Sequence, residues 1–207
     1  MFIDLTMSIS DKMPFNPDHF PPEVAPYSNI DENGWTASRM VLSTHNGTHM
    51  DAPRHFVKGA ESIDNIPLDL LIGPAQIIHL DHVLEEKTLI TPAHLPEIHQ
   101  PRVLLHTKWL ERTLGTPAYF SGFPILTPEA AIYLAEKGVR LFGLDAPSID
   151  YDGDTHTALL SRGIVIIENL INLQQLEAYC ELIALPLPLK NGDGSPIRAV
   201  ANVSARN

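Results

Sequence analysis

Three histidines and one aspartate lie within eleven residues in the first third of the chain. Residues 43–55 read STHNGTHMDAPRH, and the four groups are His45, His49, Asp51 and His55. Imidazole and carboxylate are the ligands that borderline divalent cations prefer, and hydrolytic zinc sites commonly combine nitrogen and oxygen donors. One interpretation is therefore a metal site that activates water, and the other is a loop held by hydrogen bonds alone.

The spacing of these groups restricts the local structure that can bring them together. His45 and His49 could share a helix face, but Asp51 would lie far around such a helix, and the helical H-E-x-x-H arrangement is absent. On an extended chain all four groups point the same way, yet ten residues of straight strand would spread them over roughly 33 Å. The chain must bend, and Gly47 and Pro53 are where bending costs least. We expect a strand that runs into a tight curl.

Length and composition predict one domain over residues 1–207. A chain of this size with 44% hydrophobic residues can bury a substantial core without cross-links. The net charge of −11 argues against nucleic acid or an anionic membrane as a partner, since both reward clustered Lys and Arg. There is no apolar run of the roughly 18 residues that a membrane span needs, and no basic start typical of a signal peptide. We expect a cytoplasmic protein.

Cys180 is the only cysteine, so no internal disulfide can form. It lies in an apolar run, residues 179–183, that is typical of a strand. A buried structural thiol and a reactive thiol are the two interpretations.

Many strands and few, short helices are predicted along the chain. The clearest helix covers residues 129–137, opened by Thr127-Pro128 and closed by Gly138. Shorter helices or turns are expected at 63–72, ended by Gly73-Pro74, after Thr91-Pro92, and at 156–161, capped by Asp154 or Thr155. This pattern predicts a mixed α/β fold built around a β-core. The expected strands are residues 2–9, 35–44, 75–80, 102–106, 139–144, 164–167, 183–187 and 197–203.

Residues 13–28 are rich in proline and cannot form a helix or a central strand. We expect an ordered arm across the surface. It would line a pocket, reach a neighbouring subunit, or act as a plain connector.

Two distant residues are further candidates for the site. Glu168 ends the apolar strand expected at 164–167, and a carboxylate there points toward the mouth of a sheet. His156 opens the short helix before that strand. For both residues, an ordinary structural role is the alternative.

The sequence resembles a family of bacterial metal-dependent hydrolases of the cyclase type, which includes bacterial kynurenine formamidase (arylformamidase) and isatin hydrolase. The family pattern H-x-G-T-H-x-D-x-P-x-H stands here at residues 45–55. Three companion segments in the same order argue against chance: residues 144–150 (LDAPSID), 163–170 (GIVIIENL) and 181–187 (ELIALPL). Residues 4–6 (DLT) also resemble the first strand of the family.

The resemblance implies a ligand set and a fold. His45, His49 and Asp51 would bind one divalent cation, and Asp51 would bridge to a second cation held also by His156 and Glu168. Zinc is the first expectation for the metal and manganese the second, with one or two ions per subunit. The fold would be of the swivelling β/β/α type, a single domain with a mixed β-core and few short helices, assembled into a homodimer or homotetramer.

The resemblance also implies roles for other residues. His55 would be the general acid/base, since an imidazole has an unperturbed pKa near 6.5 that suits proton transfer. Asp145, Ser148 and Asp150 would orient the ligands or serve the structure. In the arm, Asn16 stands where the family usually has Trp or Tyr, a departure that bears on the substrate and leaves the hydrolytic core intact.

The expected function is metal-dependent hydrolysis of a carbon–nitrogen bond in a small-molecule amide. The first expectation is arylformamidase activity, which converts N-formylkynurenine to kynurenine and formate in tryptophan catabolism. Hydrolysis of a cyclic amide, imide, ester or lactone is the alternative within enzymes, and a non-catalytic metal-binding protein is the alternative outside them. A serine hydrolase is disfavoured because no G-x-S-x-G elbow occurs.

Overall fold

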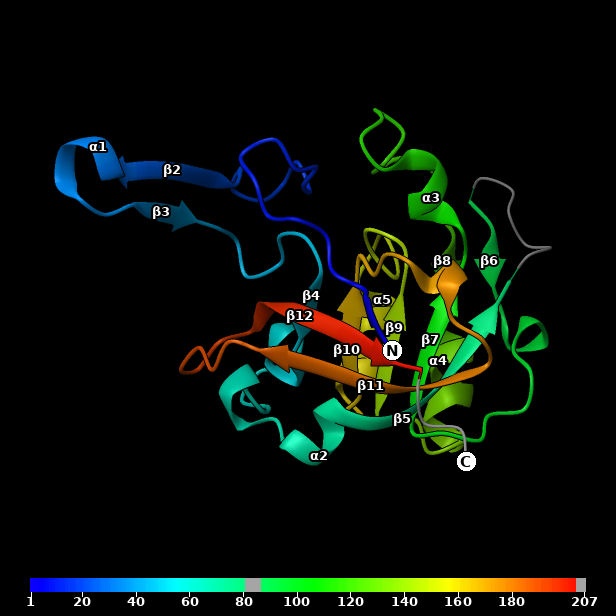
Figure 1. Cartoon of the computed structure of the whole chain (residues 1–207). Coiled ribbons are helices and arrows are strands. Elements are labelled where there is room, and N and C mark those ends of the chain that lie inside the picture. Colours follow the sequence, from blue (N-terminus) through cyan, green and yellow to red (C-terminus); the bar gives the residue numbers. More distant parts are fainter. Residues whose placement is uncertain (81–86, 204–207) are drawn as a thin grey trace.

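An eight-stranded mixed sheet forms the centre of the molecule in the computed structural model, which describes residues 1–80 and 87–203 (Figure 1). The strand order is β1-β12-β11-β5-β7-β9-β10-β4, and the sheet closes on itself because β12 also pairs with β4. The strands are β1 (Phe2–Asp4), β4 (His49–Asp51), β5 (Ile72–His79), β7 (Arg102–His106), β9 (Leu141–Leu144), β10 (Val165–Glu168), β11 (Tyr179–Pro186) and β12 (Gly194–Asn202).

The parallel strands of this sheet are buried on both faces. β5, β7, β9 and β10 pair in parallel, and such strands are expected to be near-continuous apolar runs. In β7, Val103 and Leu105 pack in one apolar cluster with helices α4 (Pro128–Glu136) and α5 (Asp154–Leu160). Leu104 between them belongs to a second cluster, which fills the inner face of the closed sheet. The sheet is therefore covered by helices outside and packed with side chains inside.

The remaining elements are short. Two small sheets pair β2 (Glu23–Ser28) with β3 (Ala37–Val41) and β6 (Leu89–Ile90) with β8 (Ile125–Leu126). The short α-helices are α1 (Ile30–Asn33), α2 (Leu68–Leu71) and α3 (Trp109–Thr113), and the 3₁₀ helices are Pro53–His55, Ile63–Asn65, Pro92–His94 and Leu173–Gln175.

The predicted α/β class, with a mixed β-core and few helices, is confirmed. The clearest predicted helix is α4, where Thr127 Oγ1 accepts a hydrogen bond from Ala130 N at 3.3 Å and Gly138 follows with a φ of +81°. The predicted end of the helix before β5 is wrong: Gly73-Pro74 does not end it, because α2 already ends at Leu71 and both residues lie inside β5. The strand expected at residues 2–9 is shorter than predicted and covers Phe2–Asp4.

The proline-rich arm is neither a helix nor a central strand, as predicted. Its later part, β2, pairs only with β3, in a register that shifts between Pro26 and Ser28. Figure 1 shows this two-stranded ribbon and α1 projecting from the body of the molecule. The ribbon consequently contributes almost nothing to the main core.

Cys180 is a buried structural thiol. It belongs to the cluster inside the sheet, and burial raises its pKa to about 11, which keeps it protonated and unreactive. Among the helices within residues 1–80 and 87–203, none has both the length and the apolar character needed to cross a membrane.

Candidate active site

The histidine run folds into a turn followed by a short strand. The bend at Gly47 was predicted, but the order differs from the expected strand running into a curl, because β3 ends at Val41 and β4 follows the turn. Gly47 has a φ of +67°, which glycine adopts without steric cost, and a Cβ there would meet Met13 Cε at 2.8 Å. β4 begins two residues later at His49. His45 therefore lies before the bend, and His49 and Asp51 lie after it on one face of the strand.

Strand pairing places a distant carboxylate beside this turn. β4 pairs antiparallel with β10, and His49 stands opposite Glu168. Because opposite residues in such a pair point to the same face, the two side chains meet, with Nε2 and Oε2 3.3 Å apart. On its other edge β4 pairs with β12, where Gly194 stands opposite Asp51. A Cβ at Gly194 would lie 2.9 Å from His45 Cε1, so only glycine leaves room for that ring.

His156 reaches the same centre from α5, which starts differently from the prediction. Its N-cap is Gly153, and not Asp154 or Thr155. Asp150 supplies the acceptors instead: Oδ1 accepts from Gly153 N at 3.2 Å, and Oδ2 accepts from Thr155 N at 2.8 Å and His156 N at 3.0 Å. Asp150 Oδ1 also lies 2.7 Å from His156 Nδ1. One carboxylate thus begins the helix and orients its histidine.

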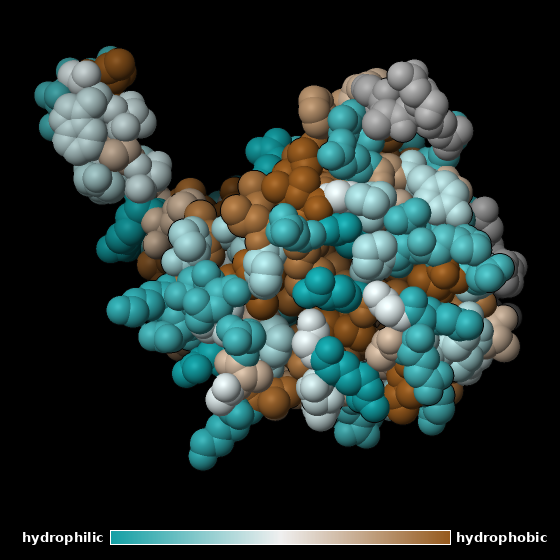
Figure 2. All heavy atoms as spheres, turned by 90° about the horizontal axis from the view of Figure 1, so that it is seen from below, coloured by the Kyte–Doolittle hydropathy of each residue, from teal (hydrophilic) through white to brown (hydrophobic). Residues whose placement is uncertain are grey.

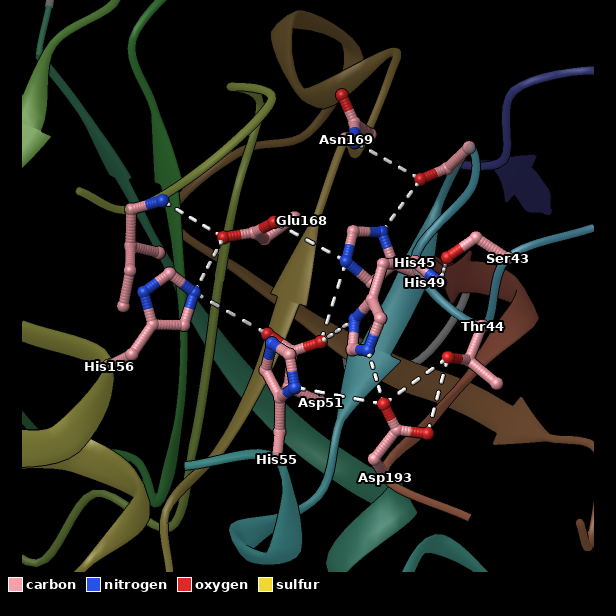
Figure 3. A network of polar contacts seen from close by, with 12 residues as sticks. Ser43, Thr44, His45, His49, Asp51, His55, His156, Glu168, Asn169 and Asp193 are labelled. Carbon is pink, nitrogen blue, oxygen red and sulfur yellow. Dashed lines mark hydrogen bonds and ion pairs between the residues drawn. The ribbon is translucent and has the colours of Figure 1, made fainter. Parts of the chain in front are cut away.

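The ligand atoms of the predicted residues converge in one cluster (Figure 3). His45 Nδ1 lies 2.8 Å and His49 Nε2 3.4 Å from Asp51 Oδ1. His156 Nε2 lies 3.6 Å from Asp51 Oδ2 and 3.2 Å from Glu168 Oε1. These contacts form two possible metal-ligand groups that share Asp51. They are His45–His49–Asp51 and Asp51–His156–Glu168, and within each group the ligand atoms lie within 4.8 Å of one another.

Hydrogen bonds fix which nitrogen of His49 faces this cluster. Nδ1 donates to Gly47 O at 2.9 Å, which leaves Nε2 directed at the two carboxylates. Asn169 Nδ2 donates to the same carbonyl at 3.1 Å, and Asn169 Oδ1 accepts from the Tyr119 hydroxyl at 2.5 Å. Ligating histidines usually donate their other N–H to a carbonyl or carboxylate in this way. His49 and His156 both fit this pattern.

The cluster is buried and attracts positive charge. Asp51 and Glu168 are 1% and 4% exposed. Burial would raise their pKa values, but the surrounding imidazoles hold the pKa of both below the usual range. The converse holds for His45 and His156: burial would lower their pKa, but hydrogen bonds to Asp193 and Asp51, and to Asp150 and Glu168, raise each to about 10.

A divalent cation fits these donors. Asp51 Oδ2 is buried without a hydrogen-bond partner, which is costly unless a cation binds there. Three imidazoles and two carboxylates form the nitrogen and oxygen set of a hydrolytic metal site. Because ligands must be deprotonated to bind metal, an incoming cation would displace the protons that His45 and His156 hold.

His55 lies at the outer edge of the cluster. It ends the 3₁₀ helix that begins at Pro53, and its ring stacks on that of His45 with centroids 4.0 Å apart. Its Nδ1 is 3.7 Å from Asp193 Oδ2, and these two residues form a third possible ligand group with His45. Burial lowers the pKa of His55 to about 4. It belongs to neither of the groups that share Asp51.

Asp193 was not singled out from the sequence. Its Oδ2 lies 2.8 Å from His45 Nε2, and its Oδ1 accepts from the Thr44 hydroxyl at 3.2 Å. The hydrogen bond from His45 lowers the pKa of Asp193 to about 2. The one signal was an acidic residue between Gly192 and Gly194 directly before a strand, which many surface turns also show.

A cavity of about 450 Å³ opens onto the cluster. Residues 14–19 of the proline-rich arm form part of its wall, so this part of the arm lines a pocket rather than acting as a plain connector. Ser148 also lines it, whereas Asp145 lies elsewhere, with its Oδ1 accepting from Thr107 N at 2.6 Å. The aromatic residues of the wall are Phe15, Phe56, Tyr119, Phe120, Phe123 and Tyr151.

The chain belongs to the cyclase family. The family model Cyclase matches residues 3–151. A kynurenine formamidase of Geobacillus thermodenitrificans is 35% identical over 205 residues, covering 96% of this chain and 95% of the relative. Membership of this family and the relatives together identify the chain as a metal-dependent hydrolase.

Solved structures of similar fold also include hydrolases. An isatin hydrolase bound to the product analogue thioisatinate superposes with a TM-score of 0.88 at 27% identity, covering 97% of this chain and 91% of that one. A potential metal-dependent hydrolase with cyclase activity gives a TM-score of 0.82 at 30% identity, covering 97% and 96%.

Metal should stabilise the folded protein. Saturation with Zn²⁺ at about 100 times its dissociation constant should add about 2.7 kcal/mol to the free energy of unfolding, measured as a rise in Tm over chelator-treated protein. Asp51→Asn should lose most of this gain because both ligand groups share Asp51. Asp11→Asn, at an exposed position, is the control. Equal Tm values with zinc and with chelator would contradict a metal site here.

Proposed function

We propose that this enzyme hydrolyses the carbon–nitrogen bond of an aryl formamide, with N-formylkynurenine as the leading substrate. The observation that carries the proposal is a buried histidine–carboxylate cluster at the floor of a cavity with aromatic walls. The curated relatives that are named kynurenine formamidase give the substrate class.

The metal is proposed to be zinc, with manganese as the alternative and one or two ions per subunit, held by His45, His49, Asp51, His156 and Glu168. A bound cation would polarise the formyl carbonyl and lower the pKa of a water molecule that attacks it. The residues of this chain supply the orientation: Gly47 O and Asp150 hold the rings of His49 and His156. The cytoplasmic location predicted from the sequence stays a prediction.

His55 is proposed to move the proton. Water oxygen bonds to the formyl carbon, the carbon–nitrogen bond breaks, and the departing aryl amine needs a proton that the attacking water must lose. His55 stands beside the ligand cluster, lines the cavity, and keeps 24% of its side chain exposed, so it can contact both water and leaving group.

Aromatic walls can receive an aryl substrate although the arm has Asn16 where the family resemblance leads us to expect Trp or Tyr. Phe123 and Tyr151 pack against each other with ring centroids 4.2 Å apart, and Phe56 stacks on His156 at 4.8 Å. These rings line the cavity together with Phe120. We infer that stacking on the substrate comes from this side of the pocket.

Hydrolysis of a cyclic amide is the second candidate, favoured by the likeness to isatin hydrolase. N-formylkynurenine, isatin and a simple lactone, assayed side by side, should give the highest kcat/KM for N-formylkynurenine. Chelator should abolish turnover and Zn²⁺ or Mn²⁺ should restore it, whereas zinc-saturated chelator should have no effect. A preference for isatin or lactone would replace the formamide proposal, and activity indifferent to chelation would end the metal mechanism.

His55→Ala should lower kcat by about 10²–10⁴-fold, the usual contribution of general acid–base catalysis, while the bound metal per chain stays unchanged. Metal content by mass spectrometry and steady-state kinetics provide the two readouts. His99→Ala removes a half-exposed histidine outside the cavity and is the matched control. A variant that loses metal instead would make His55 a ligand through the group it shares with His45 and Asp193.

A homo-oligomer is proposed from the projecting ribbon. In Figure 2 the ribbon stands clear of the body, and its apolar side chains have no core to cover them. The covering surface in this proposal is a second copy of the chain. The exposed residues are Tyr27, Ile30, Trp35, Met40 and Val41, between 46% and 67% exposed.

Replacing Ile30 and Trp35 together with Glu should convert the oligomer to monomer, because charge would have to be buried against the partner. Light scattering after size-exclusion chromatography gives the mass. Leu68→Glu places the same charge on an exposed apolar residue of α2 and should leave the mass unchanged. A wild-type monomer would refute this proposal and leave the catalytic proposal intact.

A further inference from the structure

A second group of metal-ligating side chains lies outside the active-site cavity. His106 ends β7, Glu111 lies in α3, and Asp145 follows β9, and their ligand atoms lie within 4.8 Å of one another. Glu111 and Asp145 line a separate cavity of about 340 Å³ that shares no lining residue with the first. The function proposed above uses none of these three residues.

Hydrogen bonds determine whether the His106 nitrogen that faces the carboxylates carries a proton. His79 Nε2 lies 3.1 Å from Leu176 O and must donate to it, since a carbonyl only accepts. In the neutral form of His79 its Nδ1 is therefore an acceptor, and His106 Nδ1, 2.7 Å away, donates to it. This leaves the lone pair of His106 Nε2 directed at Glu111 Oε1 (2.5 Å) and Asp145 Oδ2 (3.9 Å).

A lone pair that faces two carboxylates requires a proton or a cation between them. Either one extra proton is held by the histidine pair or by a carboxyl group, or a cation binds. His106 and Asp145 are 2% and 3% exposed, so water cannot screen the repulsion. Asp145 is also held in place, because its Oδ1 accepts from Thr107 N at 2.6 Å and Thr107 Oγ1 at 2.7 Å while Oδ2 faces His106.

Several features favour the cation over the proton. One imidazole and two carboxylates are a ligand set that zinc accepts, and the His106–His79–Leu176 relay orients the imidazole as partners of ligating histidines do. Glu111 lies at the cavity, with 35% of its side chain exposed, and can move outward to admit an ion. The cavity beside it leaves space for a water ligand.

We propose that His106, Glu111 and Asp145 bind a divalent cation of the zinc class, separate from the active-site metal. The site would anchor one end of the segment 145–150. The other end holds active-site ligands, since Ile149 N donates to Glu168 Oε1 at 2.9 Å and Asp150 orients His156. The cation would therefore have a structural role.

Zn²⁺ titration of the metal-free full chain tests this proposal, with bound zinc per chain counted by mass spectrometry. Glu111→Gln should bind one ion fewer, or bind that ion at least about tenfold more weakly, than wild type. Glu129→Gln, an exposed glutamate on α4, is the matched control and should bind as wild type does. His106→Gln should behave like Glu111→Gln, and if that buried change prevents folding, Glu111→Gln decides.

Asp51→Asn separates this site from the active site, because it should lose active-site metal and keep the ion that Glu111→Gln loses. Equal zinc content in wild type and Glu111→Gln would overturn the proposal and leave an ion pair with an extra proton. That result would not affect the function proposed above, since the two sites share no ligand.

Discussion

The negative charge of Asp51, buried at the junction of three strands, is the constraint on which the rest of the site depends. Removing a carboxylate from water costs several kcal/mol unless opposite charge and hydrogen bonds compensate it. Here the compensation comes from imidazoles on both sides, one from the turn before β4 and one from α5. Each of these rings is oriented by a further carboxylate, Asp193 for His45 and Asp150 for His156. The imidazoles that stabilise the buried charge of Asp51 are therefore also the candidate metal ligands.

β4 is the element that makes this arrangement possible. It has three residues, yet it pairs with β10 on one edge and β12 on the other, and so closes the sheet. Met50 in its centre points into the core inside the sheet, while His49 and Asp51 point to the cavity. Packing on one face therefore holds the catalytic face in position, and a one-residue slip in register would exchange the two.

Much of the site could be predicted from the sequence because its first half is local. His45, His49 and Asp51 lie in one run whose spacing demands a bend, and the bend is at Gly47 as expected. Glu168 and His156 were identified through family resemblance and strand position, and both lie in the cluster. Asp193 escaped prediction because only the pairing of β12 with β4 brings it to His45.

The start of α5 and the second ligand group were also not predicted from the sequence. Asp150 begins α5 from outside the usual cap position, because a loop folds its carboxylate back onto three backbone amides. Asp145 was predicted to orient the ligands or to serve the structure, and it lies at the end of β9 next to His106 and Glu111, outside the active site. A local loop determines the role of Asp150, and contacts with a segment distant in the sequence determine that of Asp145.

The closure of the sheet by β12 also bears on biosynthesis. Its first residues pair with β4 and its last residues with β1. These two early strands therefore complete their pairing only after β12 has been synthesised. Contacts across so many residues form slowly because loop-closure entropy opposes them. A ribosome-bound nascent chain that lacks residues 194–202 thus has every predicted ligand but only one of the two strands that pair with β4.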